Sequence, residues 1–151
     1  MKTSAFRIFS TLCAFLLLGC VAASASDATW LTDYNQAVQT AKTQNRSVLM
    51  DFTGSDWCPY CIQMDKEVLS TPEFAKYAQK NLVLLLVDFP QSKPIPQKVQ
   101  TQNNALQQQY GIEGFPTFLV VDPSGKVLQK QVGYLPGGPS AFIAWLQGGK
   151  S

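Results

Sequence analysis

Two cysteines separated by two residues are the strongest chemical feature of this 151-residue sequence, in the stretch Trp57-Cys58-Pro59-Tyr60-Cys61. At the start of a helix, such a pair can close a small disulfide with little movement of the backbone. Cys58 would then lie where unpaired helix N–H groups and the positive end of the helix dipole stabilise a thiolate. Pro59 suits the first helical turn, because its missing N–H would have no partner there. We therefore predict that Cys58 is the nucleophile and that Cys61, one turn further along, resolves a mixed disulfide.

A third candidate for chemistry is Asp51, an acid within the otherwise apolar stretch 47–53. A buried acid is costly unless it has a partner or a task. Behind the predicted active-site helix, Asp51 could take the proton from Cys61 during resolution, with its pKa raised by burial. The alternative is a structural acid whose side chain reaches solvent at the edge of the strand.

The composition disfavours other chemistries. The sequence has four cysteines and no histidine, which excludes Cys-His catalytic pairs and histidine-ligated metals. A zinc site needs four ligands, so it would have to be shared between two chains. A purely structural disulfide between Cys58 and Cys61 would close too small a loop to constrain much of the unfolded chain. Dithiol–disulfide exchange is the predicted chemistry, with no metal and no cofactor.

The elements that must position these residues follow from the apolar pattern. Strands are predicted at 47–53, 82–89, 117–121 and 126–132, and the second is a near-continuous apolar run typical of a central strand. Helices are predicted at 31–45, 58–69, 72–80, 97–110 and 139–147. Three prolines enforce an irregular connector after the second strand: Pro90, Pro94 and Pro96. The order predicts a single α/β domain with parallel strands first and a hairpin late.

A second motif, Gly-Ile-Glu-Gly-Phe-Pro-Thr at 111–117, places Pro116 directly before a predicted strand, where an X-Pro bond can be cis. Together with the Trp-Cys-x-x-Cys helix and the order of strands, this motif makes residues 30–147 resemble the thioredoxin family. The resemblance implies a thioredoxin fold, a central mixed β-sheet flanked by helices. It also implies that Pro116 is cis and lies against the disulfide, and that Phe115 offers backbone hydrogen bonds to a bound substrate.

The sequence departs from the family pattern in three places. The loop from Asp51 to Cys58 is one residue longer than in typical cytosolic thioredoxins, and the strand before the first helix is short or absent. The pair Pro59-Tyr60 resembles that of glutaredoxins. We expect Trp57 to form a lid on the thiol and, with Pro59 and Tyr60, part of the substrate surface. For Tyr60, the alternative is an exposed aromatic residue without a role.

The resemblance implies a thiol–disulfide oxidoreductase, acting as a reductase or interchange enzyme on disulfide-containing exported proteins. Potentials of such proteins span about −270 mV for thioredoxin to about −120 mV for the strongest periplasmic oxidant, and a Pro-Tyr pair suggests the middle. The missing histidine argues against a primary oxidase. A reductase would need a membrane electron donor. A thioredoxin-like binding module with an idle dithiol, and a disulfide isomerase, remain alternatives. We expect a monomer, and a monomeric mass in solution would count against an isomerase, which usually needs dimerisation.

The first residues have the pattern of an export signal. Lys2 and Arg7 form a basic start, an apolar run follows at 12–22, and small residues at 23–25 allow cleavage before the next serine. This pattern predicts a secretory signal peptide over 1–25. The apolar run is shorter than the roughly 20 residues that a membrane span needs.

A second processing route competes with the first. The stretch 17–20 resembles the bacterial lipoprotein box, in which Cys20 would become the lipidated first residue after removal of 1–19. Both routes discard Cys13 and send a thioredoxin-like domain, 26–151, out of the cytoplasm to the periplasm or beyond. That domain is formally neutral, and the whole chain's net charge of +2 is too small to predict binding to nucleic acid.

Overall fold

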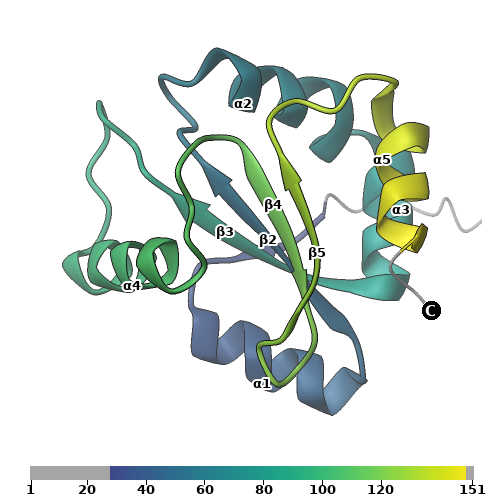
Figure 1. The fold of residues 1–151 in the computed structure, drawn as a ribbon, viewed down its shortest axis with the longest axis horizontal. Coiled ribbons are helices and arrows are strands. Elements are labelled where there is room, and N and C mark those ends of the chain that lie inside the picture. The colour runs from purple at the N-terminus through teal and green to yellow at the C-terminus, as the bar shows by residue number, and fades with distance from the viewer. Residues whose placement is uncertain (1–27, 149–151) are drawn as a thin grey trace, which may run out of the picture.

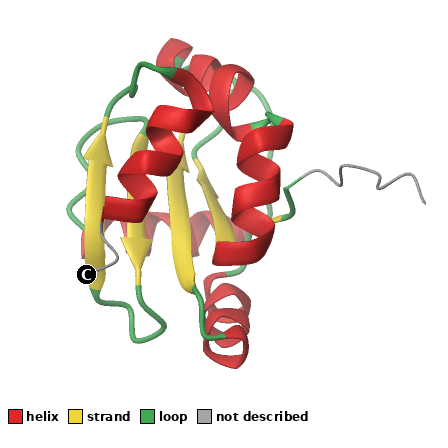
Figure 2. Ribbon diagram, turned by 90° about the vertical axis from the view of Figure 1, so that its right-hand side faces the viewer, coloured by secondary structure: helices red, strands yellow, loops and turns green. Residues whose placement is uncertain are grey.

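A five-stranded mixed sheet with helices on both faces makes up residues 28–148, the part of the chain that the computed structural model describes (Figures 1 and 2). Its elements are β1 (Trp30–Leu31), α1 (Tyr34–Gln44), β2 (Ser47–Thr53), α2 (Pro59–Met64), η1 (Asp65–Leu69), α3 (Pro72–Asn81), β3 (Leu82–Asp88), α4 (Gln97–Gln109), β4 (Thr117–Val121), β5 (Val127–Val132) and α5 (Gly138–Gly148). The strand order is β1-β3-β2-β4-β5. Strands β1, β3 and β2 are parallel, and β4 and β5 form the antiparallel hairpin. The predicted thioredoxin arrangement is confirmed.

Strand β2 is central, and its alternating side chains divide the core in two. Val48, Met50 and Phe52 join a cluster that packs against α1 and α4, whereas Leu49 joins the cluster covered by α2, η1, α3 and α5. Successive side chains of a strand point to opposite faces. Asp51 therefore points to the same face as Leu49, toward the helix that carries the cysteines.

Strands β2 and β3 finish, and β4 begins, at the same end of the sheet. Thr53, at the end of β2, pairs with Asp88 at the end of β3. On its other side, β2 pairs Phe52 with Thr117, the first residue of β4. This register brings the proline motif before β4 beside the loop that leaves β2, which is the loop that leads to Cys58.

Two predicted helices differ from the structure at one end. Helix α1 begins at Tyr34 rather than at 31, because the Asp33 carboxylate caps it by accepting the N–H of Gln36 at 3.0 Å. Leu31 pairs with Leu85 in the short strand β1 instead. The helix predicted over 58–69 changes at Asp65 into the π-helical turn η1.

Within residues 28–148, no helix combines the length and the apolar character that crossing a membrane requires. The segments predicted as a signal peptide or a lipoprotein box, including Cys13 and Cys20, lie outside the described residues.

Candidate active site

Cys58 and Cys61 form a disulfide at the start of α2, with their Cα atoms 5.2 Å apart. Cys58 is the N-cap residue of the helix, and its Sγ accepts the N–H of Cys61 at 3.3 Å. Pro59 occupies the first helical turn, where no hydrogen-bond donor is needed. The loop before it is closed by the N–H of Cys58, which donates to Gly54 O at 2.9 Å. The pairing and the helix-start position are those that the cysteine spacing predicts.

The proline motif lies beside this loop. The Phe115–Pro116 peptide bond is cis, as the family resemblance implies. Pro116 is buried, and its carbonyl accepts the N–H of Gly133 at 2.8 Å. The Phe115 ring meets Trp57 edge-on, with centroids 6.0 Å apart. The tertiary fold thus unites two motifs that are more than 50 residues apart, while a substrate-binding role for Phe115 and Pro116 remains a prediction.

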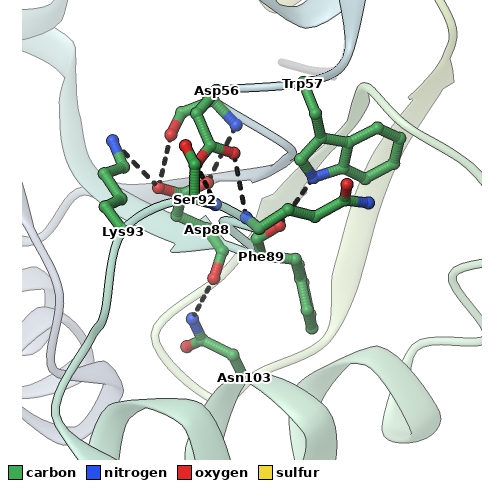
Figure 3. A network of polar contacts seen from close by, with 9 residues as sticks. Asp56, Trp57, Asp88, Phe89, Ser92, Lys93 and Asn103 are labelled. Carbon is green, nitrogen blue, oxygen red and sulfur yellow. Dashed lines mark hydrogen bonds and ion pairs between the residues drawn. The ribbon is translucent and has the colours of Figure 1, made fainter.

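Trp57 lies against its own loop and is 40% exposed. Its indole crosses Gly54 so closely that a Cβ atom at that position would collide with the ring. Its Nε1 donates to Phe89 O at 2.8 Å (Figure 3). The Phe89 ring stacks on Phe115 with centroids 5.1 Å apart, which ties the indole to both neighbouring segments. The indole is thus held by its contacts with Gly54, Phe89 and Phe115, and its role as a lid on the thiol remains a prediction.

An exposed apolar surface continues along α2. Tyr60 is 61% exposed and Ile62 is 47% exposed. The Tyr60 ring lies 6.4 Å from that of Tyr134, whose hydroxyl donates to a Glu67 carboxylate oxygen at 2.6 Å. The hydrogen bond to Glu67 thus fixes the Tyr134 ring beside that of Tyr60. Such a surface beside a disulfide suits an extended, apolar polypeptide segment.

The lengthened loop between β2 and α2 is fastened to the connector that follows β3 (Figure 3). The Asp56 carboxylate accepts the N–H of Gln91 at 3.0 Å, the N–H of Ser92 at 2.7 Å and the Ser92 hydroxyl at 2.5 Å. These hydrogen bonds, led by the one from the Ser92 hydroxyl, lower the pKa of Asp56 to about 2. Ser55 binds Asp88 through both its N–H and its hydroxyl. Hydrogen bonds of both Ser55 and Asp56 therefore hold this loop against β3 and the connector.

Asp51 is buried behind the disulfide, with 4% of its surface exposed. The alternative of an acid reaching solvent at the strand edge is wrong, because β2 is flanked by β3 and β4. Its Oδ1 has no hydrogen-bond partner among the described residues. Burial, and then the charges of Asp65 and Asp88, raise the pKa of Asp51 to about 8. Asp51 also lines a cavity of about 240 Å³ that Cys61 lines too. This shared cavity supports, as a prediction, the proton-accepting role of Asp51.

Three residues of this site have no role in the predictions from the sequence: Asp65, Phe89 and Ser92. Asp65 lines the same cavity, and its position four residues after Cys61 on one helix was the available indication. Phe89 was predicted as the last residue of the strand 82–89, but β3 ends at Asp88. Ser92 lies in the connector that follows, where no periodic pattern exists. The contacts of Phe89 and Ser92 depend on strand register, so the sequence carried no local indication of them.

Comparison with known proteins agrees with this geometry. Residues 34–150 match the family of thioredoxin-like domains. Over 111 residues the chain is 36% identical to "Disulfide bond reductase DsbH" of Chlamydia pneumoniae, covering 74% of this chain and 66% of that protein. It is 34% identical to "Thioredoxin-related protein DsbJ" of the same organism, over 61% of this chain and 26% of that one. Less than two thirds of either relative's length is therefore matched.

The fold also matches a solved structure. A structure titled "DsbH Oxidoreductase" superposes with a TM-score of 0.79 at 29% identity, covering 97% of this chain and 94% of that one. The family match extends over most of the chain, from α1 past the end of α5, and includes the disulfide and the cis proline. The chain belongs to the family of thioredoxin-like domains.

Proposed function

We propose that this protein is a thiol–disulfide oxidoreductase that reduces or exchanges disulfides in exported proteins. The observation that carries the proposal is the Cys58–Cys61 disulfide at the start of α2, with the buried acid Asp51 behind it. The relative named as a disulfide bond reductase supports the same chemistry. The exposed side chains of Trp57 and Tyr60 supply a surface for a polypeptide substrate.

The chemistry proceeds from the reduced pair. The Cys58 thiolate, stabilised by the N-terminus of α2, attacks a substrate disulfide, and one substrate sulfur leaves as a thiolate that takes a proton from water. Asp51 then accepts the proton of Cys61. The resulting Cys61 thiolate attacks the Cys58 sulfur and displaces the second substrate sulfur. The substrate gains two electrons, and the protein is left with the disulfide seen in the structure.

Reduction is the proposed physiological direction. The sequence has no histidine to stabilise the Cys58 thiolate further, as a strong oxidant would require. A reductase of this kind must be reduced again, and we assign that task to a membrane electron donor. The redox potential of the pair is expected between about −270 and −120 mV. An equilibrium with glutathione or dithiothreitol measures it, and a value at the oxidising end would contradict the direction.

Turnover of insulin disulfides tests the activity. The parent protein should precipitate reduced insulin chains, whereas the Cys58→Ser variant should not. The Cys61→Ser variant should instead accumulate a mixed disulfide with the substrate through Cys58. Equal turnover by the parent and the Cys58→Ser variant would favour a binding module with an idle dithiol. Efficient refolding of scrambled ribonuclease by a dimer would favour an isomerase.

The export route is part of the proposal. A soluble domain that starts at Ser26 and a lipid-anchored one that starts at Cys20 differ in mass and in membrane association. Mass spectrometry of the protein from a bacterial envelope distinguishes the two products. A full-length product that keeps Met1 in the cytoplasm would contradict both routes.

A further inference from the structure

The cavity behind the disulfide contains a second carboxylate that the mechanism above does not use. It has a volume of about 240 Å³ and is lined by Cys61 of α2, Asp51 of β2 and Asp65 of η1. Trp30, Leu69 and Leu86 contribute apolar wall. Its volume is sufficient for several water molecules, each of which occupies about 30 Å³ in the liquid. The cavity therefore joins the resolving cysteine to two acids.

Asp65 is held at this cavity by the helix that carries the cysteines. It follows Cys61 by four residues, so the two side chains lie on one face of the helix. The π-helical turn begins at Asp65, and the N–H of Ser70 closes it by donating to Asp65 O at 2.8 Å. The Ser70 hydroxyl also donates to Asp65 Oδ1 at 2.9 Å. Asp65 is exposed, in contrast to Asp51, and it occupies the solvent side of the cavity.

The charged groups near Asp51 are nearly all negative. Asp65 faces it from η1 and Asp88 from the end of β3, and both raise its pKa, after the larger effect of burial. Among the residues that the structure describes, the lining of the cavity includes no lysine or arginine. Asp88 itself forms an ion pair, at 3.7 Å, with Lys93 of the connector. Asp65 is therefore the charged neighbour of Asp51 that shares its cavity with Cys61.

We propose that Asp65 is a positioning residue for resolution: it is the outer acid of a two-carboxylate path between Cys61 and solvent, and its charge controls how strongly Asp51 holds a proton. The inference rests on the proposed oxidoreductase function. In the resolution step, the S–H proton of Cys61 moves to Asp51 while the new Cys58–Cys61 bond forms and the bond from Cys58 to the substrate breaks. The proton then leaves Asp51 for water in the cavity, past Asp65. The charge of Asp65 strengthens proton binding by Asp51, and the Asp65 carboxylate gives the leaving proton a second acceptor on the way to solvent.

Titration of Asp51 tests the proposal without turnover. Carboxyl ¹³C shifts of aspartate-labelled protein, held oxidised, follow its protonation from about pH 5 to pH 10. In the Asp65→Asn variant, the Asp51 midpoint should fall by about half a pH unit or more, because a nearby negative charge is lost. In the Asp65→Glu variant, which restores the charge, the midpoint should return toward that of the parent.

The matched control is Glu67→Gln. It removes one negative charge from the same turn, but the Glu67 carboxylate binds Gln63 and Tyr134 outside the cavity. Its Asp51 midpoint should move by less than a third of the change in Asp65→Asn. An unchanged midpoint in Asp65→Asn, or an equal change in Glu67→Gln, would overturn the proposal.

Single-turnover kinetics provide the functional arm. The rate at which the mixed disulfide resolves should rise with pH through the Asp51 midpoint, and Asp65→Asn should move this rise to lower pH by the same amount. A pH profile that does not move, although the Asp51 midpoint does, would overturn the role of Asp65 in resolution. A parent protein without any disulfide turnover would instead refute the oxidoreductase function, and the carboxyl titration would still decide whether Asp65 acts on Asp51.

Discussion

In the folded protein, the protonated, neutral form of the Asp51 carboxyl group is favoured over the charged form up to a pH of about 8. The side chain is buried, one of its oxygens lacks a described partner, and two other acids are its charged neighbours. In the unfolded chain the same carboxyl ionises near its ordinary pKa of 3.8, whereas in the folded chain the pKa is about 8. The unfolded state therefore releases this proton first as the pH rises. Between these two values, the folded state loses stability with increasing pH.

The Asp51→Asn variant should remove this loss. An amide resembles the protonated acid in shape and has no proton to lose, so the gain in unfolding free energy should be small near pH 4 and largest near pH 8. The size at pH 8 should be about 3 to 6 kcal/mol, since each pKa unit is worth about 1.4 kcal/mol. Urea unfolding of the oxidised proteins at several pH values measures it.

The control for that measurement is Asp33→Asn. Hydrogen bonds, led by the one from the Gln36 N–H, lower the pKa of Asp33, so its charged form stabilises the fold above its unfolded pKa. This variant should lose stability at neutral pH and differ less from the parent below about pH 3. A gain for Asp51→Asn that does not grow with pH would contradict the buried-acid explanation.

The reactivity of Cys58 is a second property of single residues. In the reduced protein, its sulfur at the N-cap should be a thiolate at lower pH than a free cysteine, because the helix end offers N–H groups to it. We expect Cys58 to react with iodoacetamide about tenfold faster than free cysteine near pH 6.5. Cys61 should react much more slowly, and the Cys58→Ser variant isolates its rate. Equal rates for the two thiols would contradict the assignment of the nucleophile.

At the scale of elements, the connector between β3 and α4 acts as a brace for the active-site loop. It receives the indole of Trp57 at Phe89 and the carboxylate of Asp56 at Gln91 and Ser92. The side chain of Asn103 in α4 donates to Asp88 O at 2.8 Å, which holds the end of β3 where the connector starts (Figure 3). Because the loop ends at Cys58, these contacts help to set the position of Cys58 relative to the rings of Trp57 and Phe115.

Removing the brace should loosen the connector and slow the enzyme. For Asp56→Ala, we expect amide exchange at Gln91 and Ser92, whose N–H groups Asp56 accepts, to rise at least tenfold. We also expect kcat/KM for insulin to fall several-fold, while the redox potential changes little. Hydrogen–deuterium exchange and insulin turnover measure the two effects.

Asp122→Ala is the matched control for this prediction. Its carboxylate accepts the same kinds of bonds, from the N–H and hydroxyl of Ser124 and the N–H of Lys126, in the hairpin between β4 and β5. It should leave both the connector and insulin turnover unchanged. Similar losses in both variants would mean that general destabilisation, not the brace, controls the rate.

At the scale of the whole molecule, the aromatic part of the core and the cysteine pair occupy different places in the fold. Helices α3 and α5 pack an aromatic group against the sheet on the face that also carries α2. In this group, Phe142 is fully buried, with ring centroids 4.9 Å from Phe118 and 5.9 Å from Phe74. The cysteines lie instead at the start of α2. Helix α2 follows the loop that leaves the end of the sheet where β2 and β3 finish and β4 begins (Figure 1).

Phe142→Ala should therefore cost stability without changing the dithiol. The cavity and the lost apolar burial should lower the unfolding free energy by about 3 to 5 kcal/mol. Val132→Ala, at a position 61% exposed on β5, should change it by less than about 1 kcal/mol. Both variants should keep the potential of the parent pair under conditions where they are folded. A changed potential in Phe142→Ala would show that this part of the core reaches the active site.

Short-range features of the sequence were enough to predict most helices and strands and the Cys58–Cys61 pair. The apolar run of β3, the cysteine spacing and Pro59 each act over a few residues, so their effects can be inferred without the fold. Helix α1 is an exception, because it was predicted to begin at 31 but begins at Tyr34. Asp33 caps it through a local contact, whereas Leu31 pairs with Leu85 of β3 through a long-range one.

Tertiary structure decided what surrounds the pair. The burial of Asp51 depends on β2 lying between β3 and β4, and the brace by Ser92 depends on β3 ending beside β2. The cavity that joins Cys61 and Asp65 to Asp51 exists because α2 and η1 pack over that face of the sheet. Such contacts link segments tens of residues apart, and strand order and register set them. A sequence determines these distances only through the complete fold. The dithiol and a buried acid behind it could be predicted from the sequence, but the place of Asp65 at the cavity and the contacts of Ser92 could not.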